Sequence, residues 1–381
     1  MKIVAKQWIL SICTGVPALK RITIIYPWGD PLKEGSGSSA RTKGIIRLLV
    51  NLSKEFNVTI EGVGIKSYSN GPIVQLGCIP GKFGLLLDFN PWYFLRRVQK
   101  REDVLIISGP LGIFGALVGR FLSRKLIKIV YDAHNVEKER MKLGAFSTKT
   151  SLLRIITRII LTISEFLAVK YADCIIAISH RDKRLFREEY GAPLERIRVV
   201  YPAIEPVPLS PERHSGVLFH GSFKYVPNRE ALEALLKISE KLPWVEFYIA
   251  GSGMFKGKMD NVMFLGFVEN LNEFFKLGDL AVAPLKRGAG VKLKIVDYLS
   301  RGIPVVTTSI GAQGLELTNE KNAVVVDDLE EMARRVEFLF ENPKYKRKIG
   351  LLGRRHVERL LSREQAGKNL MDCIRWEKEL I

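Results

Sequence analysis

The sequence is poor in cysteine, and the spacing of its cysteines excludes the usual metal-binding patterns. Four occur in 381 residues, and they are far apart, at Cys13, Cys78, Cys174 and Cys373. Cys174 lies in the apolar run CIIAI, where a reduced thiol serves as a small hydrophobic side chain. Because no cysteine calls for an oxidising compartment, we expect reduced thiols and a cytoplasmic location.

Internal repeats of the solenoid type are absent, and no single residue type dominates the composition. These absences exclude solenoid and fibrous architectures. The hydrophobic content of 47% excludes a largely disordered chain. A chain of 381 residues is long for a single hydrophobic core, so we expect two domains.

Acidic residues are fewer than basic residues. The chain has 40 Asp and Glu against 59 Lys and Arg, which gives a formal net charge of +19. Such a surface attracts nucleic acid, anionic lipid headgroups or phosphorylated substrates, and composition does not choose among them. A basic surface without a partner is the alternative.

The first twenty residues weakly resemble a signal peptide, since Lys2 and Lys6 precede the apolar stretch WILSICTGVPAL. No small-residue cleavage site follows, and Lys20 and Arg21 lead straight into an apolar strand. We therefore expect an extension, either membrane-contacting or a misassigned start, rather than a secretion signal.

From Arg21 onward, short β-branched runs alternate with helical patterns, which is typical of parallel sheets with crossover helices. The pattern restarts after PAIEPVPLSPERHSG, which we interpret as a linker. The expected fold class is α/β, with two Rossmann-like doubly wound domains facing each other across a ligand-binding cleft. The expected division is an extension (1–20), a first domain (21–208), a second domain (209–362) and a C-terminal helix packing back toward the first (363–381). Strands are expected at 22–26, 58–62, 104–108, 127–132, 174–178, 216–220, 246–250, 262–265, 280–284 and 304–308, and helices at 40–55 and 112–123.

Residues 284–317 carry the clearest sign of a binding site. A strand is expected to end at Pro284, and a two-glycine loop then leads into a helix near Val291. The free N–H groups of a helix start attract anions, paired lysines suit a diphosphate, and a carboxylate one turn further can accept hydrogen bonds from ribose hydroxyls. The alternative is a surface helix with ordinary charges, which the coincidence of these features at a strand end disfavours. The residues are Gly288, Gly290, Lys292, Lys294 and Asp297.

This stretch resembles the donor-binding region of the family-4 glycosyltransferases, G-x-G-x-[RK]-x-K-[hydrophobic]₂-E followed by G-x-P-V-V. Other segments resemble the family's motifs in the family's order: YDAHNVE, ADCIIAISHRDKRLF, FHGSFKYVPNREAL, YIAGSG, FLGFVENLNEFF and VAPL. The resemblance covers most of the chain from Arg21 onward. It implies a retaining transferase of the GT-B fold that uses a UDP- or GDP-linked sugar. Ala289 and Asp297 stand where many members carry the E-x7-E pair, so the chain is similar to the subgroup without the first glutamate, and VVYPAIE replaces the usual Pro-Asn-Gly.

The resemblance assigns roles residue by residue. His134 becomes the acceptor-side active-site residue, which orients hydroxyls and steadies charge without attacking the sugar; a satisfied core histidine is the alternative. Asp297 would bind ribose. The donor diphosphate would be bound by Gly221, Ser222, Lys224, Gly290, Lys292 and Lys294. The donor and base pocket would be shaped by Gly251, Gly253, Phe267 and Val268, and a glycine-rich loop over the cleft by Gly35 and Gly37.

No Asp-x-Asp metal motif of the other glycosyltransferase fold is present, so we expect neither a metal nor a cofactor. A dehydrogenase would carry G-x-G-x-x-G after its first strand, and EGSGSSA lacks the third glycine. A phosphorylase would need greater length and a cofactor lysine site. A GT-B epimerase and a basic nucleic-acid-binding protein are the alternatives, the second without a groove-reading helix or stacking aromatics.

Residues 151–170, SLLRIITRIILTISEFLAVK, contain two arginines and a glutamate, which argue against a membrane span. The polar stripe through Arg154, Arg158 and Glu165 predicts a core helix with its apolar residues buried; an interfacial helix is the alternative. With the basic clusters nearby, the pattern suggests that the first domain meets anionic lipid at the inner face of a membrane. The expected acceptor is lipid-linked or a saccharide, in glycolipid, lipid-linked oligosaccharide or polysaccharide synthesis. The clusters are Arg96, Arg97, Lys100 and Arg101, and Arg120, Arg124, Lys125 and Lys128.

Overall fold

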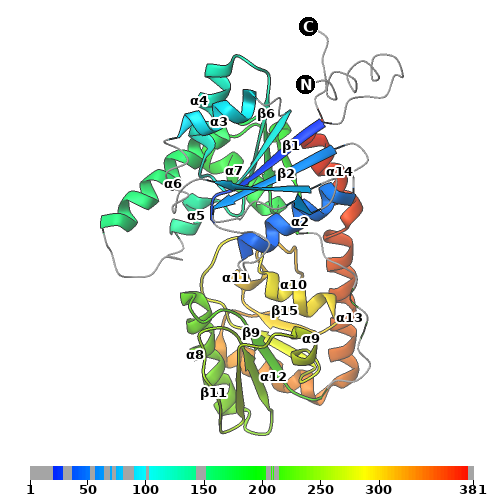
Figure 1. The fold of residues 1–381 in the computed structure, drawn as a ribbon. Coiled ribbons are helices and arrows are strands. Elements are labelled where there is room, and N and C mark those ends of the chain that lie inside the picture. The colour runs from blue at the N-terminus through cyan, green and yellow to red at the C-terminus, as the bar shows by residue number, and fades with distance from the viewer. Residues whose placement is uncertain are drawn as a thin grey trace.

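The protein folds into two α/β halves, one above the other in Figure 1. The computed structural model describes residues 20–28, 37–51, 56–63, 69–70, 74–79, 90–99, 103–142, 152–202, 207, 209 and 214–375. Each half is a mostly parallel sheet with crossover helices, the arrangement that alternating β-branched and helical patterns dictate.

The first half contains an eight-stranded sheet in the order β3-β4-β2-β1-β5-β6-β7-β8. Its pairings are parallel except for β3 with β4. The central strands read as continuous apolar runs because helices cover both faces, and β5 is buried along its whole length. The strands are β1 (Lys20–Tyr26), β2 (Phe56–Val63), β3 (Ser69–Asn70), β4 (Val74–Ile79), β5 (Val104–Ser108), β6 (Lys128–Asp132), β7 (Cys174–Ala177) and β8 (Ile197–Val199). The helices are α2 (Gly37–Asn51), α3 (Pro91–Gln99), α4 (Ile113–Ser123), α5 (Glu137–Lys142), α6 (Leu152–Tyr171), α7 (His180–Tyr190) and the 3-10 helix η2 (Leu194–Arg196).

The second half contains a seven-stranded sheet in the order β11-β12-β10-β9-β13-β14-β15, in which only β11 pairs antiparallel. Its core is a single large apolar cluster. The strands are β9 (Val217–His220), β10 (Phe247–Ala250), β11 (Lys256–Met259), β12 (Val262–Gly266), β13 (Leu280–Ala283), β14 (Val305–Thr307) and β15 (Val324–Val325). The helices are α8 (Val226–Lys241), α9 (Leu271–Phe274), α10 (Leu293–Ser300), α11 (Ser309–Ala312), α12 (Leu329–Glu341), α13 (Pro343–Leu360) and α14 (Arg363–Ile374).

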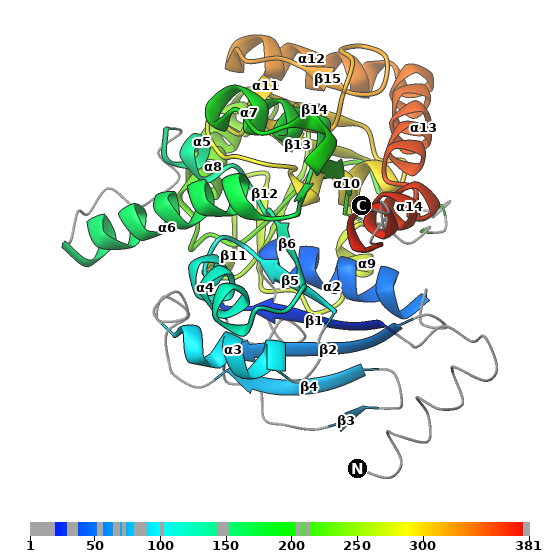
Figure 2. The same ribbon diagram turned by 90° about the horizontal axis from the view of Figure 1, so that it is seen from above.

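The chain crosses between the halves twice. The first crossing follows β8, and the second is α13, which runs up one side of the molecule and delivers α14 to the first sheet (Figure 1). Figure 2 shows α14 beside α2, and α14 also contacts β6, β7 and β8. Its residues Leu370 and Ile374 are fully buried in the core of the first half. The last helix therefore ties the second half back to the first.

Every predicted strand is present, with ends that differ by at most two residues. The glycine-rich loop is shorter than expected, because α2 begins at Gly37 and not near residue 40. The helix expected near Val291 begins at Leu293. Most of the expected N-terminal extension and Gly35 lie outside the described residues.

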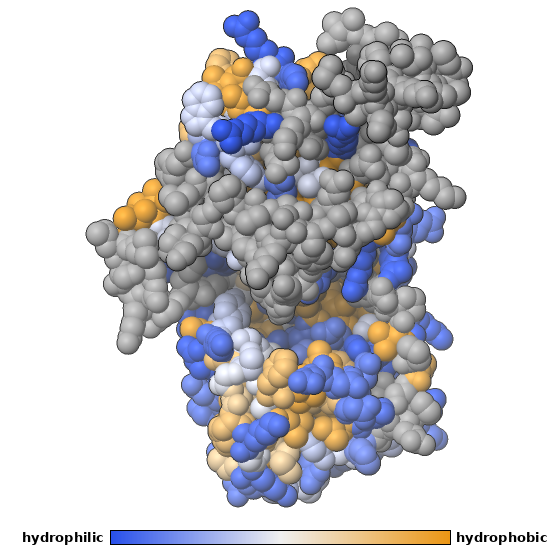
Figure 3. Space-filling view, viewed as in Figure 1, coloured by the Kyte–Doolittle hydropathy of each residue, from blue (hydrophilic) through white to orange (hydrophobic). Residues whose placement is uncertain are grey.

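The expectation that α6 is a buried core helix is wrong. Glu165 is fully buried together with the apolar Leu161 and Ala168, while Ile159 and Ile163 have more than half of their surface exposed, 52% and 54%. The sequence pattern identifies a two-sided helix but not which side the protein covers. Hydrophobic colouring at the left margin of the upper half in Figure 3 coincides with the place of α6 in Figure 1.

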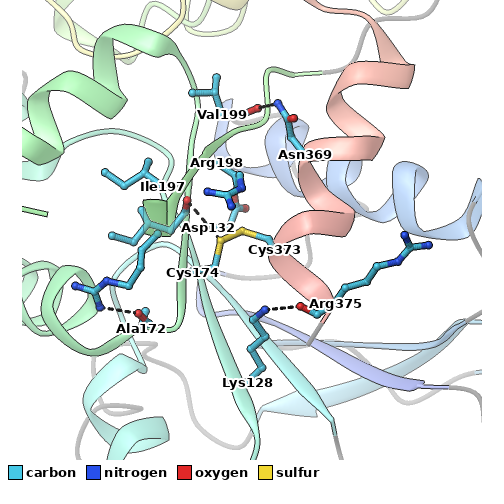
Figure 4. Close-up of a disulfide and its surroundings, with 12 residues drawn as sticks. Lys128, Asp132, Ala172, Cys174, Ile197, Arg198, Val199, Asn369, Cys373 and Arg375 are labelled. Atoms are coloured by element: carbon cyan, nitrogen blue, oxygen red, sulfur yellow. Dashed lines mark hydrogen bonds between the residues drawn. A yellow bond between two sulfur atoms is a disulfide. The ribbon is translucent and has the colours of Figure 1, made fainter. Parts of the chain in front are cut away.

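The expectation of a reduced Cys174 is also wrong: it forms a disulfide with Cys373. The two cysteines are 199 residues apart in sequence, but α14 brings their Cα atoms to 5.6 Å. Two hydrogen bonds anchor the same helix, from Asn369 Nδ2 to the Val199 carbonyl (2.6 Å) and from Lys128 Nζ to the Arg375 carbonyl (2.8 Å) (Figure 4). Sequence spacing could not reveal the pair, because only the return of α14 to the first sheet creates it.

Candidate active site

The candidate donor site lies where the strand order of the second sheet reverses. Strands β9 and β13 are neighbours there, and the chain leaves them in opposite directions along the sheet. Ligands of open α/β sheets bind in the crevice at such a switch point. Gly221 follows β9, and the loop of residues 284–292 follows β13 and leads into α10. The segments expected to bind a diphosphate therefore converge on one crevice.

Lys294, in the first turn of α10, extends toward Gly221. Its Nζ donates to Asn228 Oδ1 at 2.7 Å and lies 4.2 Å from the ring centre of Phe219. Burial lowers the pKa of Lys294 to about 7, and the nearby Asp297 carboxylate opposes part of that shift. Among the described residues no carboxylate lies at hydrogen-bond distance from this buried ammonium, which favours pairing with an anionic ligand.

Lys292 occupies the N-cap position of α10 and makes no side-chain cap. Its Nζ donates to the Gly290 carbonyl at 2.6 Å. Burial lowers the pKa of Lys292 to about 8, and Asp182 of α7 favours the charged form. The other charges that act on Lys292, Arg181 and Glu139, also belong to the first half, so its charge state depends on the contact between the two halves.

Two glycines allow backbone segments to meet at this crevice. Gly251 has φ of 154°, and a Cβ there would lie 1.7 Å from the Gly221 carbonyl oxygen. Gly290 has φ of 68°, and a Cβ there would lie 2.4 Å from Asn135 Oδ1 and 3.4 Å from the His134 carbonyl oxygen. A larger residue at position 290 would be strained at this φ and would displace the end of the Asn135 side chain. The loop after β13 therefore rests against the segment that carries His134.

His134 follows β6 and joins a buried polar network. Its Nε2 lies 2.8 Å from Ser108 Oγ, which donates to Asp132 Oδ2 at 3.1 Å. Because the single Ser108 proton is shared among Asp132, Thr42 and His134, we assign the Nε2–H tautomer to the neutral ring, which leaves Nδ1 as its acceptor. Burial lowers the pKa of His134 to about 4, with Asp132 opposing the shift. The imidazole is therefore neutral at physiological pH.

Asp132 is itself held by Arg41 of α2. The Arg41 guanidinium lies 3.0 Å from Asp132 Oδ1, both side chains are almost fully buried, and Arg41 also donates to the Val200 carbonyl. Thr42 Oγ1, on the next residue of α2, lies 2.7 Å from Ser108 Oγ. Removing one member of a buried ion pair leaves an uncompensated charge, so Arg41 and Asp132 depend on each other. Helix α2 thereby fixes the support under His134.

Glu165 connects the exposed helix α6 to the same segment. Its carboxylate accepts the backbone N–H groups of Glu137 and Lys138, at 2.9 and 3.3 Å, and the hydroxyls of Tyr131 and Tyr190. These N–H groups open α5, two residues after Asn135. Burial raises the pKa of Glu165 to about 7, opposed by these donors. The start of α5 is therefore anchored from α6.

Comparisons with known proteins identify the fold and the class of activity. Residues 48–207 match the family model described as Glycosyltransferase Family 4, and residues 214–342 match that described as Glycosyl transferases group 1. The chain belongs to the family-4-like glycosyltransferases. It is also 26% identical over 285 residues to EpsD of Bacillus subtilis (strain 168), whose own assignment as a glycosyltransferase is provisional; the match covers 66% of this chain and 71% of EpsD.

Solved structures show that this glycosyltransferase has the GT-B fold. Sucrose-phosphate synthase from Thermosynechococcus elongatus superposes with a TM-score of 0.74 at 14% identity, covering 92% of this chain and 97% of that one. HepE of Anabaena, in complex with UDP and glucose, superposes with a TM-score of 0.66 at 16% identity, covering 92% and 98%. Neither the epimerase nor the nucleic-acid-binding alternative gains support from these comparisons.

Several of the remaining predicted residues of the glycosyltransferase lie around the crevice in the second half. Ser222 and Lys224 are exposed in the turn after β9, where Ser222 Oγ is 3.1 Å from Ser252 Oγ. A Cβ on Gly253 would lie 3.2 Å from Lys224 Cγ, so these two turns touch. Phe267 and Val268 line a separate surface cavity of the second half, whose lining includes none of the residues expected to bind the diphosphate. Gly37, by contrast, is the first residue of α2.

Sequence reasoning missed several residues that hold the predicted ones. Asn228 bridges the crevice, since its Oδ1 accepts from Lys294 and its Nδ2 donates to the Ser222 carbonyl at 2.8 Å. Ser108 and Arg41 support His134 from other elements. The sequence held one indication of the role of Ser108: it is the last residue of β5, the strand that pairs with β6. Within the described ranges, no group of three His, Cys, Asp or Glu side chains could hold a metal ion, and no helix is long and apolar enough to cross a membrane.

Proposed function

We propose that this glycosyltransferase transfers a sugar from a UDP- or GDP-linked donor to a hydroxyl acceptor with retention of the anomeric configuration. The observation that carries the proposal is the contact between the Gly290 loop, flanked by its two lysines, and the segment of the first half that carries His134. The HepE complexes with UDP and with UDP-glucose support a nucleotide-sugar donor in this fold.

On the donor side, the diphosphate would lie at the start of α10. Lys292 and Lys294 supply positive charge there, with Lys224 at the rim. The N–H groups of Gly221 and Phe223 are engaged with the Ala250 and Ser252 carbonyls, so the lysines carry this role. As the bond from the anomeric carbon to the phosphate oxygen breaks, negative charge grows on the leaving diphosphate. Preorganised cations stabilise that charge in the way a metal ion does in other transferases, so the reaction needs neither a metal nor a cofactor. Asp297 would bind the ribose hydroxyls, and Phe267 and Val268 would flank the base.

On the acceptor side, the hydroxyl oxygen would approach the anomeric carbon on the face that the diphosphate leaves. A new carbon–oxygen bond forms, and the hydroxyl proton passes to the departing phosphate oxygen. His134, neutral and held through Nε2, offers Nδ1 to orient a hydroxyl. It remains uncharged throughout and does not attack the sugar.

The acceptor would be lipid-linked, and the enzyme would work at the inner, anionic face of a membrane. Three adjoining helices of the first half, α3, α4 and α6, expose large apolar side chains, which we term the apolar face. Its residues are Trp92, Phe114, Phe121, Leu122, Ile155, Ile156, Ile159, Ile163 and Phe166. Basic residues such as Arg124 and Lys125 adjoin it. Apolar groups beside basic ones suit insertion between anionic headgroups, and the products would belong to glycolipid, lipid-linked oligosaccharide or polysaccharide synthesis.

A donor and acceptor screen tests the proposal. Purified protein would be incubated with UDP- and GDP-sugars, with and without lipid-linked acceptors, and release of nucleoside diphosphate would be measured. We expect release from one donor, strong stimulation by acceptor, and a product whose anomeric configuration by NMR equals that of the donor. Inverted configuration would refute retention, and no release from any donor would refute the transfer.

A further inference from the structure

Asp297, the carboxylate expected to bind ribose, is in contact with a buried histidine. His220, the last residue of β9, lies behind Asp297, with Nε2 3.4 Å from Oδ2. The histidine side chain is 12% exposed and the aspartate side chain 42% exposed. The imidazole therefore approaches Asp297 from the protein interior, while the carboxylate stays open toward the crevice.

Hydrogen bonds define which nitrogen of His220 carries the proton. The Tyr298 hydroxyl accepts the backbone N–H of His220 at 2.8 Å and lies 2.8 Å from His220 Nδ1. Burial raises the pKa of Tyr298 well above its usual value, so the phenol keeps its single proton. No other acceptor for that proton occurs among the described residues. The proton therefore points to Nδ1, and the neutral ring bears its own proton on Nε2, facing Asp297.

Aromatic neighbours hold the imidazole in place. The rings of Phe274, Phe275 and Tyr298 lie 5.8, 5.5 and 5.0 Å from it, centre to centre, and all three meet it close to edge-on. Burial lowers the pKa of His220, with Asp297 opposing the shift, so the ring is uncharged in the free protein. This packing and the hydrogen bond to Tyr298 favour the observed ring orientation, since a flip about Cβ–Cγ would put a carbon where Nδ1 meets the Tyr298 hydroxyl.

We infer that Tyr298 and His220 form a relay that positions Asp297 for ribose recognition. Tyr298 holds His220 by hydrogen bonds, the Nε2–H of His220 faces Oδ2 across an electrostatic contact of 3.4 Å, and Oδ1 is left to accept the ribose hydroxyls. An aspartate at this position of α10 reaches one methylene less far than a glutamate. The relay compensates by fixing the direction in which the shorter carboxylate points. His220 and Tyr298 are positioning residues, because they act on the ligand only through Asp297.

This inference rests on the proposed ribose-binding role of Asp297, so the experiment measures both separately. Calorimetry would compare the affinity for UDP or GDP, whichever binds, with that for its 2′,3′-dideoxy counterpart. The ratio of the two affinities reports ribose recognition alone. In the wild type we expect the ratio to be about tenfold or more, the usual size of one charge-assisted hydrogen bond.

Variants of Asp297 and His220 distinguish failure of the ribose-binding role from failure of the relay. Asp297→Ala should abolish the preference for ribose, and if it does not, the role of Asp297 fails and the relay with it. His220→Phe should reduce the preference about tenfold without changing the affinity for the dideoxy ligand. His220→Gln, which keeps a donor at the position of Nε2, should restore most of it. A folded His220→Phe protein with the full wild-type preference would overturn the relay while leaving Asp297 in its role.

A measurement on the wild-type protein covers the case in which His220→Phe does not fold. Nitrogen-15 labelling of histidine allows the tautomer of each of the five rings to be read by NMR, and Tyr298→Phe assigns the responsive one. We expect His220 to be the neutral Nε2–H form, and to lose that preference in Tyr298→Phe. A wild-type His220 protonated on Nδ1 would overturn the relay directly.

Discussion

Burial governs the chemistry of the individual residues around the crevice. It lowers the pKa of two lysines that would otherwise be fully charged, Lys292 to about 8 and Lys294 to about 7. It also keeps the imidazole of His134 neutral. In the free protein the two lysines therefore lose their protons readily, and a bound anion would favour the charged form. The histidine, by contrast, acts in its neutral form.

The first prediction concerns Lys294. Bound diphosphate should raise its pKa above the free value of about 7, so binding takes up a proton. We therefore expect nucleoside diphosphate affinity to weaken as the pH rises from about 7 to 9. Titration calorimetry in buffers of different ionisation enthalpy measures the uptake. Lys294→Met should bind about tenfold more weakly or worse, with proton uptake reduced; pH-independent affinity and equal uptake in both proteins would refute the assignment.

The second prediction concerns His134. His134→Ala should lower kcat by about 10²–10⁴-fold while the nucleotide affinity stays close to wild type, because the residue belongs to the first half and the nucleotide crevice to the second. Since its pKa is about 4, this group should cause no loss of activity between pH 7 and pH 5. A thermal melt separates catalysis from folding. Near-wild-type turnover by a well-folded variant would identify His134 as purely structural.

At the scale of whole elements, α6 buries a charged residue and leaves several large apolar side chains in solvent. Glu165 is fully buried and anchors the start of α5, while the isoleucines on the other side meet solvent. Leaving several large apolar side chains in water is unfavourable, and such patches commonly mark interaction surfaces. Glu165 connects α6 to the start of α5, which directly follows the segment that carries His134. A partner that binds α6 would therefore lie close to the candidate active site.

The third prediction tests the apolar face of the glycosyltransferase. The double variant Ile159→Glu and Ile163→Glu should lose co-sedimentation with anionic vesicles at low salt, because charge is placed where apolar groups would enter the bilayer. Trp244→Glu is the matched control, since Trp244 is an exposed apolar residue of the second half and its replacement should leave vesicle binding unchanged. Rising salt should weaken wild-type binding as screening shortens the reach of the basic residues. Equal binding by all three proteins would refute this surface.

At the scale of the whole molecule, the disulfide adds a covalent link between α14 and the first sheet to the two places where the backbone crosses between the halves. The fourth prediction is that reductant lowers stability. Closing a loop of 199 residues restricts the unfolded chain by about 5 kcal/mol in the chain-entropy treatment, so the denaturation midpoint should fall clearly on reduction. The Cys174→Ser, Cys373→Ser double variant should match the reduced protein and ignore reductant. An unchanged midpoint in the oxidised and reduced wild type would contradict the prediction.

The architecture and the crevice could be predicted because their signals are local. β-branched runs indicate the central strands of both sheets, but the short or edge strands were not predicted; these are β3, β4, β8, β11 and β15. The lysines after β13 lie within a few residues of Gly288 and Gly290 in the sequence. Other features depend on neighbours that sequence does not reveal. Asn228 and His220 acquire their partners only when α8 and β9 meet α10. The outward face of α6 depends on which side the sheet covers, and the pairing of Cys174 on the return of the last helix.

The disulfide also changes the connectivity of the molecule. From Cys174 to Cys373 the backbone and the sulfur bridge close a covalent ring that contains the whole second half. A protease that cuts once within this ring would leave one piece of unchanged mass apart from a water molecule, and the fragments would separate only after reduction. The two halves of this enzyme can therefore be nicked without being parted, for as long as the bridge lasts.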